Sequence, residues 1–419
     1  MVFLLLVVAI VLTASIVLWI ARRSRRKSSF TSYDSLPEPT PIYITPEQLA
    51  TYDGRPWRPF RWPYHQTMSI YKLDVNHWLD MDRYYPHLIE SKQQVFAKWG
   101  RDYLDWLPES ADGCQELMEV VVNHMLLRYP NLFSAVNADH TVIRNEITGD
   151  VIDMTPPLQH HPLKYVARIA QEDFYVVKQR SDGRHYLVAA AVAFPGGGFG
   201  VSDKLGQHLD VIHGEVPLYK EKLQKSMEKW FGRLEVGKPV ERASWLLTWD
   251  HKLRTTGCYA DGPHTGHQNT DLSTLPDEAL NVRIERQALR RLPRSRVIVF
   301  SNHPLYYSIE EMKDEPMVPS LIKQVINHAD ERIVRYKNFP VSKNRANDLL
   351  DRLISRQLEL GIIDKEEPIR TLPTYPFAHW VVQDVDENGW TNPGSSYTKE
   401  KYNWLPDKFD ESSYPTNGF

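Results

Sequence analysis

The hydrophobic pattern begins with an uninterrupted apolar segment at the start of the chain. Residues 1–20 carry no charged side chain, and a helix of that length rises about 30 Å, roughly the thickness of the hydrocarbon core of a bilayer. The basic cluster Arg22-Arg23-Ser24-Arg25-Arg26-Lys27 follows this segment, whereas a cleaved signal peptide has its positive charges before the apolar run. The pattern therefore predicts a transmembrane anchor over residues 1–21, with a signal peptide cleaved near Ala14-Ser15 as the alternative.

The charges around this segment predict its orientation. Because the basic residues lie on the side of the body, the positive-inside rule places the body in the cytosol. We therefore expect a single-pass membrane protein, with the endoplasmic reticulum as the default membrane. Residues 22–59 are basic and rich in proline, and this composition predicts a linker between the anchor and the body.

Beyond the linker, the spacing of apolar residues changes along the chain. Leu117, Val121 and Met125 recur every four residues, which is typical of an amphipathic helix. The nearly continuous apolar run over residues 186–194 predicts a strand that is buried on both faces. Residues 281–289 alternate well enough to predict another strand.

The order of the predicted elements indicates the fold class and the domain limits. Helices come first, then strands interleaved with helices, then helices again, and this order favours an α+β fold. The last predicted core strand covers residues 297–300, and residues 252–276 form a long loop with few apolar side chains. We assign the folded domain to residues 60–361 and an irregular C-terminal tail to residues 362–419.

Composition excludes several classes of function. A net charge of −3 gives no reason to expect a nucleic-acid partner. Cys114 and Cys258 are the only cysteines in the sequence, too few for a four-thiolate zinc site or an iron–sulfur cluster. Any iron–sulfur centre that serves this protein must therefore belong to another chain. The run Gly196-Gly197-Gly198-Phe199-Gly200 lacks the spacing of a dinucleotide fingerprint and is predicted to be a turn.

Two residues suit a haem site. His213 ends a helical face that carries Leu209 and Ile212, and Gly214 follows it. A neutral imidazole in an apolar pocket is the usual proximal haem ligand, although a satisfied core or capping histidine is commoner. Arg242 precedes another predicted strand, and its five donors suit a haem propionate or bound oxygen. A surface ion pair is the ordinary alternative for Arg242.

A polar stretch interrupts the strand predicted over residues 281–289. In a strand, Arg283, Glu285 and Gln287 share one face, and Arg286 lies on the other. Three polar residues on one face indicate either an exposed, salt-bridged face, which is the commoner case, or a buried polar network. If it is buried, the carboxylate needs a cationic partner, and an amine substrate could supply that charge.

Several short motifs together resemble the alpha subunit of the haem-dependent oxidative N-demethylases, over about residues 60 to 360. The shorter motifs are Thr67-Met68-Ser69-Ile70, Trp78-Leu79-Asp80-Met81-Asp82, Ala193-Phe194-Pro195 and Lys204-Leu205-Gly206. The more specific motifs are Ile212-His213-Gly214-Glu215-Val216-Pro217 and Arg283-Ile284-Glu285-Arg286-Gln287-Ala288-Leu289-Arg290-Arg291-Leu292-Pro293-Arg294-Ser295.

The resemblance implies a PAS-like antiparallel sheet core with added helices, here preceded by one transmembrane helix, that binds haem b. The implied activity is that of a monooxygenase that oxidises a small or N-methylated amine, such as dimethylamine, with molecular oxygen. Electrons come from NADPH through a partner reductase, with flavin and iron–sulfur centres on partner chains. By the same resemblance His213 is the axial ligand of the haem iron, and Glu285 holds the cationic amine. Arg242 polarises the oxygen or pairs with a propionate, and Arg283 and Arg286 are expected cofactor contacts.

The sequence departs from the family pattern at the anchor, in the loop over residues 252–276, in the C-terminal tail and at Ser301-Asn302-His303-Pro304, which we place after the last core strand. The altered segment leaves the substrate open. Two alternatives to the enzyme remain: a non-catalytic, haem-binding PAS-like sensor or carrier, and an interaction module whose haem site has decayed.

Overall fold

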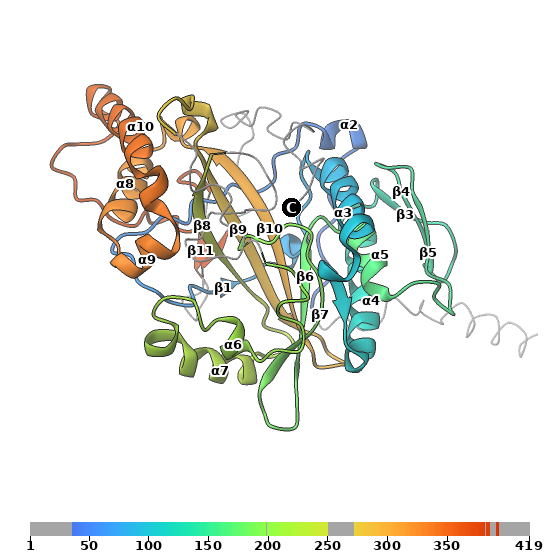
Figure 1. The fold of residues 1–419 in the computed structure, drawn as a ribbon. Helices are drawn as coiled ribbons and strands as arrows, with labels where there is room; N and C mark the ends of the chain where they lie inside the picture. Colours follow the sequence, from blue (N-terminus) through green and yellow to red (C-terminus); the bar gives the residue numbers. More distant parts are fainter. Residues whose placement is uncertain (1–35, 198, 250–271, 382, 386–390, 394–419) are drawn as a thin grey trace, which may run out of the picture.

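A seven-stranded antiparallel sheet forms the centre of the computed structural model, which describes residues 36–197, 199–249, 272–381, 383–385 and 391–393 (Figure 1). The strand order is β1-β8-β9-β10-β6-β7-β2. The strands are β1 (Tyr71–Lys72), β2 (Leu104–Trp106), β6 (Asp173–Gln179), β7 (His185–Ala191), β8 (Val240–Thr248), β9 (Asn281–Arg291) and β10 (Ile298–Ser308).

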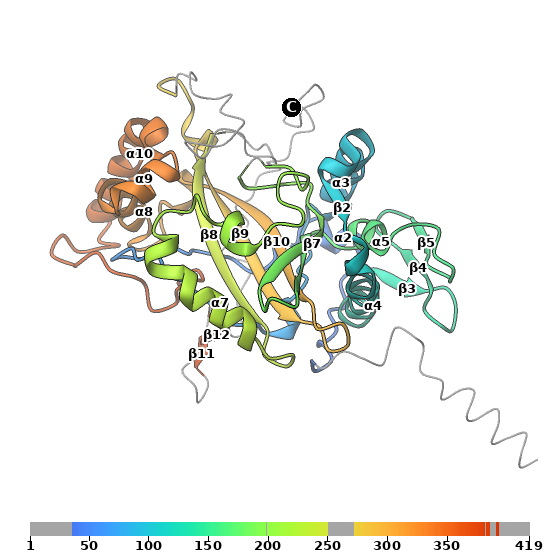
Figure 2. The ribbon, with the colours of Figure 1, turned by 60° about the horizontal axis from the view of Figure 1, so that its bottom comes forward.

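Helices lie on two sides of this sheet and across its lower end in Figure 1 (Figures 1 and 2). They are α2 (Pro46–Leu49), α3 (Tyr85–Trp99), α4 (Ala111–Arg128), α5 (Pro162–Ile169), α6 (Leu209–Ile212), α7 (Gln224–Arg233), α8 (Val318–His328), α9 (Glu331–Tyr336) and α10 (Phe339–Glu359). Two smaller sheets are β3 (Phe133–Ala135), β4 (Val142–Asn145) and β5 (Val151–Asp153), and the hairpin of β11 (Gln383–Val385) with β12 (Thr391–Pro393). The expected α+β class with an antiparallel sheet is thereby confirmed.

The two faces of the sheet pack against different helices. On one, Leu289 and Ile298 pack with Met227 and Phe231 of α7, and Figure 2 shows α7 in front of β8. We call this the α7 face. The other face, which we call the Arg286 face, packs at one end against α8 and α10 and at the other against α4 and α5. Since side chains alternate along a strand, neighbours in β9 belong to opposite faces.

Residues on both sides of the expected domain limits pack against the body. The rings of Trp57 and Phe377 lie 4.7 Å apart, and both are buried. Arg58 forms a buried ion pair with Glu315, and Val381 is buried as well. The packed structure therefore begins before residue 60 and extends past residue 361.

The fold class needs one correction, which concerns the transmembrane helix expected over residues 1–21. Among the described residues, no helix is long and apolar enough to cross a membrane. Helix α10, with 21 residues, has the length, but charged residues such as Arg345, Asp348 and Arg352 interrupt its apolar positions. Residues 1–35 lie outside the described residues, as does most of the loop expected over 252–276. For the described residues the fold class is therefore corrected to α+β with antiparallel sheets, without a membrane-spanning helix.

Candidate functional site

Polar side chains form a row across three strands on the α7 face. In the antiparallel register Arg242 of β8 lies opposite Gln287 of β9, and Gln287 lies opposite Asn302 of β10. Glu285 lies in the next row on the same face, two residues along β9 and opposite Ser244. Because directly opposed residues of antiparallel strands project to the same face, Arg242 and Glu285 lie on the same face of the sheet.

Glu285 is the buried carboxylate of this site, with 4% of its surface exposed. One carboxylate oxygen, Oε1, accepts a hydrogen bond from Nε of Arg283, and the other, Oε2, accepts one from Nδ2 of Asn302. The exposed, salt-bridged face that was the commoner expectation is therefore wrong, and the buried network is confirmed. The cationic partner of the carboxylate is an arginine of the same strand.

The guanidinium of Arg283 is held by hydrogen bonds to other residues of the protein. Its side chain is fully buried, and besides Glu285 it donates to the hydroxyl of Tyr306 at 2.6 Å and to the carbonyl oxygen of Phe194 at 2.8 Å. These bonds hold the guanidinium beside the carboxylate. We therefore assign Arg283 to positioning Glu285, and this geometry does not support the cofactor contact that we expected for it.

A glycine turn lies directly against Glu285. A Cβ atom placed on Gly196 would lie 2.6 Å from Oε1 of Glu285, closer than nonbonded atoms approach. Only glycine lets the backbone come this near without moving the carboxylate. The turn that the sequence predicts at residues 196–200 therefore has a second effect, which is to close one side of the site.

Arg242 carries a charge that no neighbouring carboxylate balances. Its side chain is half-buried, and Nε is buried without a hydrogen-bond partner among the described residues. Burial lowers the pKa of Arg242, while Tyr64 and Tyr375 act in the opposite direction. In the described part of the chain Arg242 forms no ion pair, so the surface pairing considered for it is not observed. An uncompensated cation of this kind is suited to bind an anion.

His213 lies above the same face, at the C-terminus of α6. Its Nδ1 lies 2.7 Å from the carbonyl oxygen of Leu209, and because a carbonyl only accepts, Nδ1 carries the proton. Burial lowers the pKa of His213 to about 4, so the imidazole is neutral and Nε2 keeps its lone pair. Within the described residues Nε2 makes no hydrogen bond. The capping interpretation thus accounts for one ring nitrogen and leaves the other available to a ligand.

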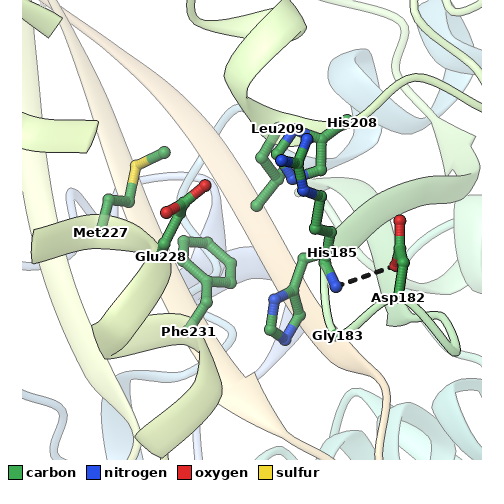
Figure 3. Close-up of a pocket in the computed structure, with 9 residues that line it drawn as sticks. Asp182, Gly183, His185, His208, Leu209, Met227, Glu228 and Phe231 are labelled. Atoms are coloured by element: carbon green, nitrogen blue, oxygen red, sulfur yellow. Dashed lines mark hydrogen bonds between the residues drawn. The ribbon is translucent and has the colours of Figure 1, made fainter. Parts of the chain in front are cut away.

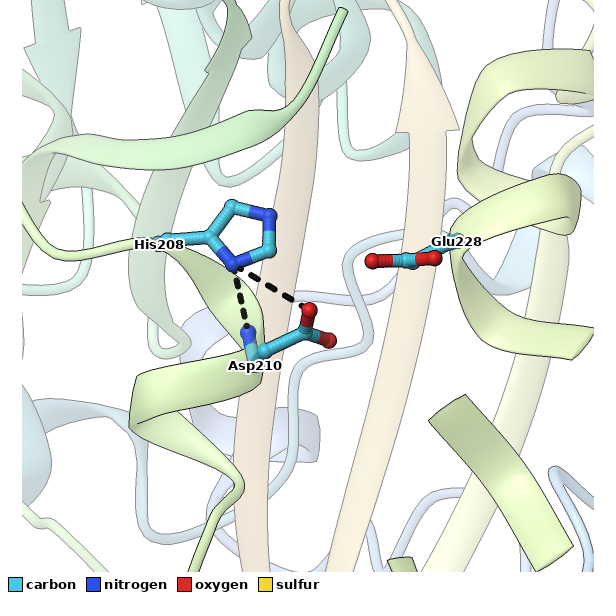
Figure 4. A group of neighbouring side chains, drawn as sticks. All are labelled: His208, Asp210 and Glu228. Carbon is cyan, nitrogen blue, oxygen red and sulfur yellow. Dashed lines mark hydrogen bonds and ion pairs between the residues drawn. The ribbon is translucent and has the colours of Figure 1, made fainter. Parts of the chain in front are cut away.

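Next to His213 lies a group of residues of the types that bind metal ions, and Tyr219 connects this group to the imidazole. The hydroxyl of Tyr219 donates to Asp210, and the Tyr219 ring stacks on that of His213 with centroids 5.5 Å apart. His208, Asp210 and Glu228 lie with ligand atoms within 4.8 Å of one another (Figure 4). A hydrogen bond to Asp210 raises the pKa of Glu228, and Nδ1 of His208 accepts from the backbone N–H of Asp210. These groups satisfy one another, and their evident effect is to hold Tyr219.

The cavity drawn in Figure 3 adjoins this group, since His208 and Glu228 line it. It has a volume of about 190 Å³ and is lined by the turn between β6 and β7 and by side chains of α7, together with His185 and His208. This volume is below the roughly 300–1,000 Å³ of pockets for drug-sized ligands. None of the site residues expected from the sequence lines it, so we do not place the substrate there.

Arg286 lies on the opposite face of β9. Its guanidinium is buried, 3.5 Å from Asp80, 3.8 Å from Glu172 and 3.8 Å from Glu241. The sheet separates it from His213 and Glu285. The structure places Arg286 in a cluster of charges on the other side of the sheet, so it does not bring Arg286 together with His213 and Glu285, and its cofactor contact stays a prediction.

Sequence reasoning missed Asn302, which is the second partner of Glu285. We placed the end of the last core strand at Phe300, whereas β10 continues to Ser308. Pro304 misled that assignment, because proline argues against a central strand. Beyond Asn302, however, β10 pairs with β9 alone, and a strand with one free edge tolerates proline. The alternation that continues through Asn302 was the available signal.

A comparison with protein families matches the region that contains these residues. The family model described as "Haem-dependent oxidative N-demethylase, alpha subunit-like" matches residues 69–347, more than half of the chain. The matched region includes His213, Arg242, Glu285 and Asn302.

Proposed function

Because the chain belongs to the haem-dependent oxidative N-demethylase, alpha subunit-like family, we propose that it binds haem b and oxidatively removes an N-methyl group from a small amine. The family is one of oxidative enzymes that depend on haem and require a substrate and an electron donor. The identity of the amine, the haem type and the electron donor are the proposed parts of this function.

The donor set on the α7 face fits a haem. A neutral imidazole whose Nδ1 is bound to a backbone carbonyl presents Nε2, and this is the form in which histidine ligates haem iron. An arginine with an orphaned buried Nε suits a propionate carboxylate or developing negative charge on oxygen. His213 would therefore hold the iron, and Arg242 would supply the positive charge. Arg242 and His213 are close enough for the charge of Arg242 to lower the pKa of His213.

The protein residues would bind and orient the amine. The haem, when bound, supplies the iron centre at which oxygen is reduced and the amine is oxidised. Glu285 holds the cationic amine through a charge-assisted hydrogen bond. Arg283 and Asn302 fix the carboxylate from two directions, and the Gly196 turn excludes water from its third side. This burial strengthens the electrostatic contacts of the site.

Electrons would reach the site from a partner reductase. The two cysteines in the sequence are too few to hold an iron–sulfur cluster, which supports flavin and iron–sulfur centres on a partner chain. Cys114 is buried, and burial raises the pKa of its thiol to about 12, so it is not a reactive thiolate. We therefore propose that this chain contributes the haem and the amine site alone.

The observation that carries the proposal is the fixed tautomer of His213, and haem binding tests it. We expect the protein reconstituted with haem to show a Soret band that His213→Ala weakens and shifts. His185→Ala is the matched control, because His185 is also buried but lies at the cavity of Figure 3. Absence of a Soret band in the wild-type protein would remove the haem function, and an unchanged band in His213→Ala would remove this ligand.

A second experiment separates the enzyme from a haem-binding sensor or carrier. A carrier needs no buried carboxylate beside its haem, whereas amine oxidation does. With reductant, oxygen and a panel of methylamines, we expect formaldehyde from the wild type and a roughly 100-fold lower rate from Glu285→Gln, since a hydrogen bond to a charged group contributes about 3 kcal/mol at most. The Soret band should persist in the variant. No formaldehyde from any amine would favour the sensor.

A further inference from the structure

The side-chain nitrogen of Asn302 makes a hydrogen bond, whereas its side-chain oxygen has no hydrogen-bond partner among the described residues. The residue is 4% exposed and lies in β10, near the middle of the sheet. Its Nδ2 donates to Oε2 of Glu285, and since a carboxylate can only accept, this bond fixes which amide atom is nitrogen. The remaining atom, Oδ1, is buried and has no hydrogen-bond partner among the described residues. Buried acceptors without a donor are rare in folded proteins.

The neighbours of Asn302 in the sheet do not supply the missing donor. The side chain of Gln287, directly opposite on β9, makes no hydrogen bond with a described residue. Asp173, opposite on β6, accepts the backbone N–H groups of Ala193 and Phe194 at 2.9 and 2.8 Å. The carboxylate of Asp173 therefore acts as an acceptor for these two N–H groups and does not donate to Asn302. The free acceptor instead lies next to the carboxylate that is proposed to bind the amine.

We propose that Oδ1 of Asn302 is the second acceptor of the amine site. This inference rests on the proposed function. It identifies the group that distinguishes substrates by the number of N–H donors on their nitrogen. A secondary ammonium has two N–H donors, one for Glu285 and one for Asn302. A tertiary ammonium has a single donor, so it leaves Oδ1 of Asn302 unsatisfied inside the protein. Asn302 adds this acceptor without adding charge, which matters because Arg283 already neutralises Glu285.

Asn302 also differs from Glu285 in what it contributes to binding. Glu285 interacts with any ammonium through charge, whether the nitrogen carries one or two hydrogens. Oδ1 of Asn302 interacts only through a hydrogen bond and therefore discriminates by direction and by donor count. We therefore assign Asn302 as a specificity residue of the proposed amine site.

The test compares two probe amines, dimethylamine and trimethylamine, at a pH at which both are protonated. Isothermal titration of the haem-loaded full chain gives the dissociation constant of each, and the ratio of the two constants is the readout. In Asn302→Leu we expect the preference for dimethylamine to fall by about tenfold, the size of one lost hydrogen bond. If Asn302 only positioned Glu285, both amines would weaken equally and the ratio would not move.

Two further variants keep the test decisive. Asn302→Thr retains a hydroxyl that can donate to Glu285 and accept from the substrate, so it should preserve part of the preference even if the leucine variant fails to fold. Ser308→Ala is the matched control, because it removes another buried and unpartnered oxygen from β10 at the far end of the strand. We expect it to leave the ratio unchanged.

The outcomes separate this inference from the proposed function. If the wild type binds neither haem nor dimethylamine, both fail. If dimethylamine binds and Glu285→Gln abolishes that binding, but Asn302→Leu leaves the ratio unchanged, the second acceptor alone is excluded and a buried water satisfies Oδ1. A shift of the ratio in Ser308→Ala as large as that in Asn302→Leu would also overturn the assignment.

Discussion

The two faces of strand β9 differ in whether their charged side chains are paired with opposite charges. On the Arg286 face, Arg286 lies among the carboxylates of Asp80, Glu172 and Glu241 at 3.5 to 3.8 Å. Glu241 is also bound by Arg55 through two hydrogen bonds of 3.1 and 2.6 Å. Each of these charges has an opposite charge close by, and all of them except the half-buried Asp80 are buried.

On the α7 face the polar groups are less complete. Arg242 has no ion pair among the described residues, and Nε of Arg242 and Oδ1 of Asn302 are buried there without a hydrogen-bond partner. Glu285 and Arg283 form an ion pair. Burial without a partner is costly and is retained where function requires it. Buried atoms without a hydrogen-bond partner occur on both faces, and they include Nε and Nη2 of Arg286. The difference between the faces therefore lies in the pairing of charges: we interpret the balanced charges of the Arg286 face as stabilising the fold, and the unbalanced Arg242 of the α7 face as suited to bind a ligand.

The largest effect is expected from Arg286→Met, which removes the cation of the Arg286 face and keeps an unbranched side chain. Three carboxylates would then remain buried together near its position. Breaking a buried ion pair in this way costs about 3–5 kcal/mol, so we expect the free energy of unfolding to fall by that amount. Urea denaturation of the haem-free protein measures it.

A compensating change tests whether the carboxylates cause this loss. Glu172→Gln removes one negative charge close to both Arg286 and His303. Combined with Arg286→Met, it should recover at least about 1 kcal/mol of the stability lost. Strictly additive losses in the double variant would mean that the charges on this face are not coupled.

A smaller effect on the same face depends on pH. Although burial opposes the charged imidazole, hydrogen bonds and charges of Asp82 and Glu172 raise the pKa of His303 to about 9. The protonated form therefore stabilises the folded state below about pH 6.5, and this contribution, up to about 3 kcal/mol, is lost as the pH rises through 9. We expect the stability advantage of the wild type over His303→Gln to shrink between pH 6.5 and 9.5 in urea denaturation.

His213 on the α7 face supplies the contrast for this pH dependence. Because burial lowers the pKa of His213 to about 4, its imidazole does not change charge between pH 6.5 and 9.5. The difference in stability between the wild type and His213→Gln, both free of haem, should therefore stay constant over this range. Parallel curves for His303→Gln as well would show that His303 is not held in its charged form.

The local pattern of the sequence predicted the elements better than the site. The four-residue spacing of Leu117, Val121 and Met125 lies in α4, and the apolar run over residues 186–194 begins within β7. Alternation in β9 correctly separated Arg283 and Glu285 from Arg286. These features depend on neighbours within one element, so they are encoded locally.

Long-range pairing explains what the sequence did not reveal. The row of Arg242, Gln287 and Asn302 exists only because three strands, far apart in the chain, align in register. Alternation gave the two faces of β9 but not what packs against each of them, so the cluster of charges around Arg286 was not predicted. Helix α6 is only four residues long, and the contact of His213 with Leu209 could not be read from apolar spacing.

Gly196→Ala is expected to disturb the α7 face and leave the Arg286 face intact. The added methyl group would lie 2.6 Å from Oε1 of Glu285, and overpacking of this kind costs about 1–3 kcal/mol. We expect weaker amine binding by titration calorimetry, because the carboxylate must move. Gly232→Ala in α7 is the control, since no atom lies within 4 Å of its added Cβ. Equal amine affinity in both variants would mean that the turn does not set the position of Glu285.

The smallest change in stability is expected from Arg242→Met, although the substitution is the same as at Arg286 and both arginines belong to the central sheet. No ion pair is lost at Arg242 among the described residues, and its burial already lowers its pKa. The haem-free variant should therefore be within about 1 kcal/mol of the wild type or more stable, while haem titration followed by absorbance should show weaker binding. If Arg242→Met loses as much stability as Arg286→Met, then Arg242 has a structural partner and the α7 face is as closed as the other. If it loses haem affinity alone, the unbalanced charge is maintained for the ligand.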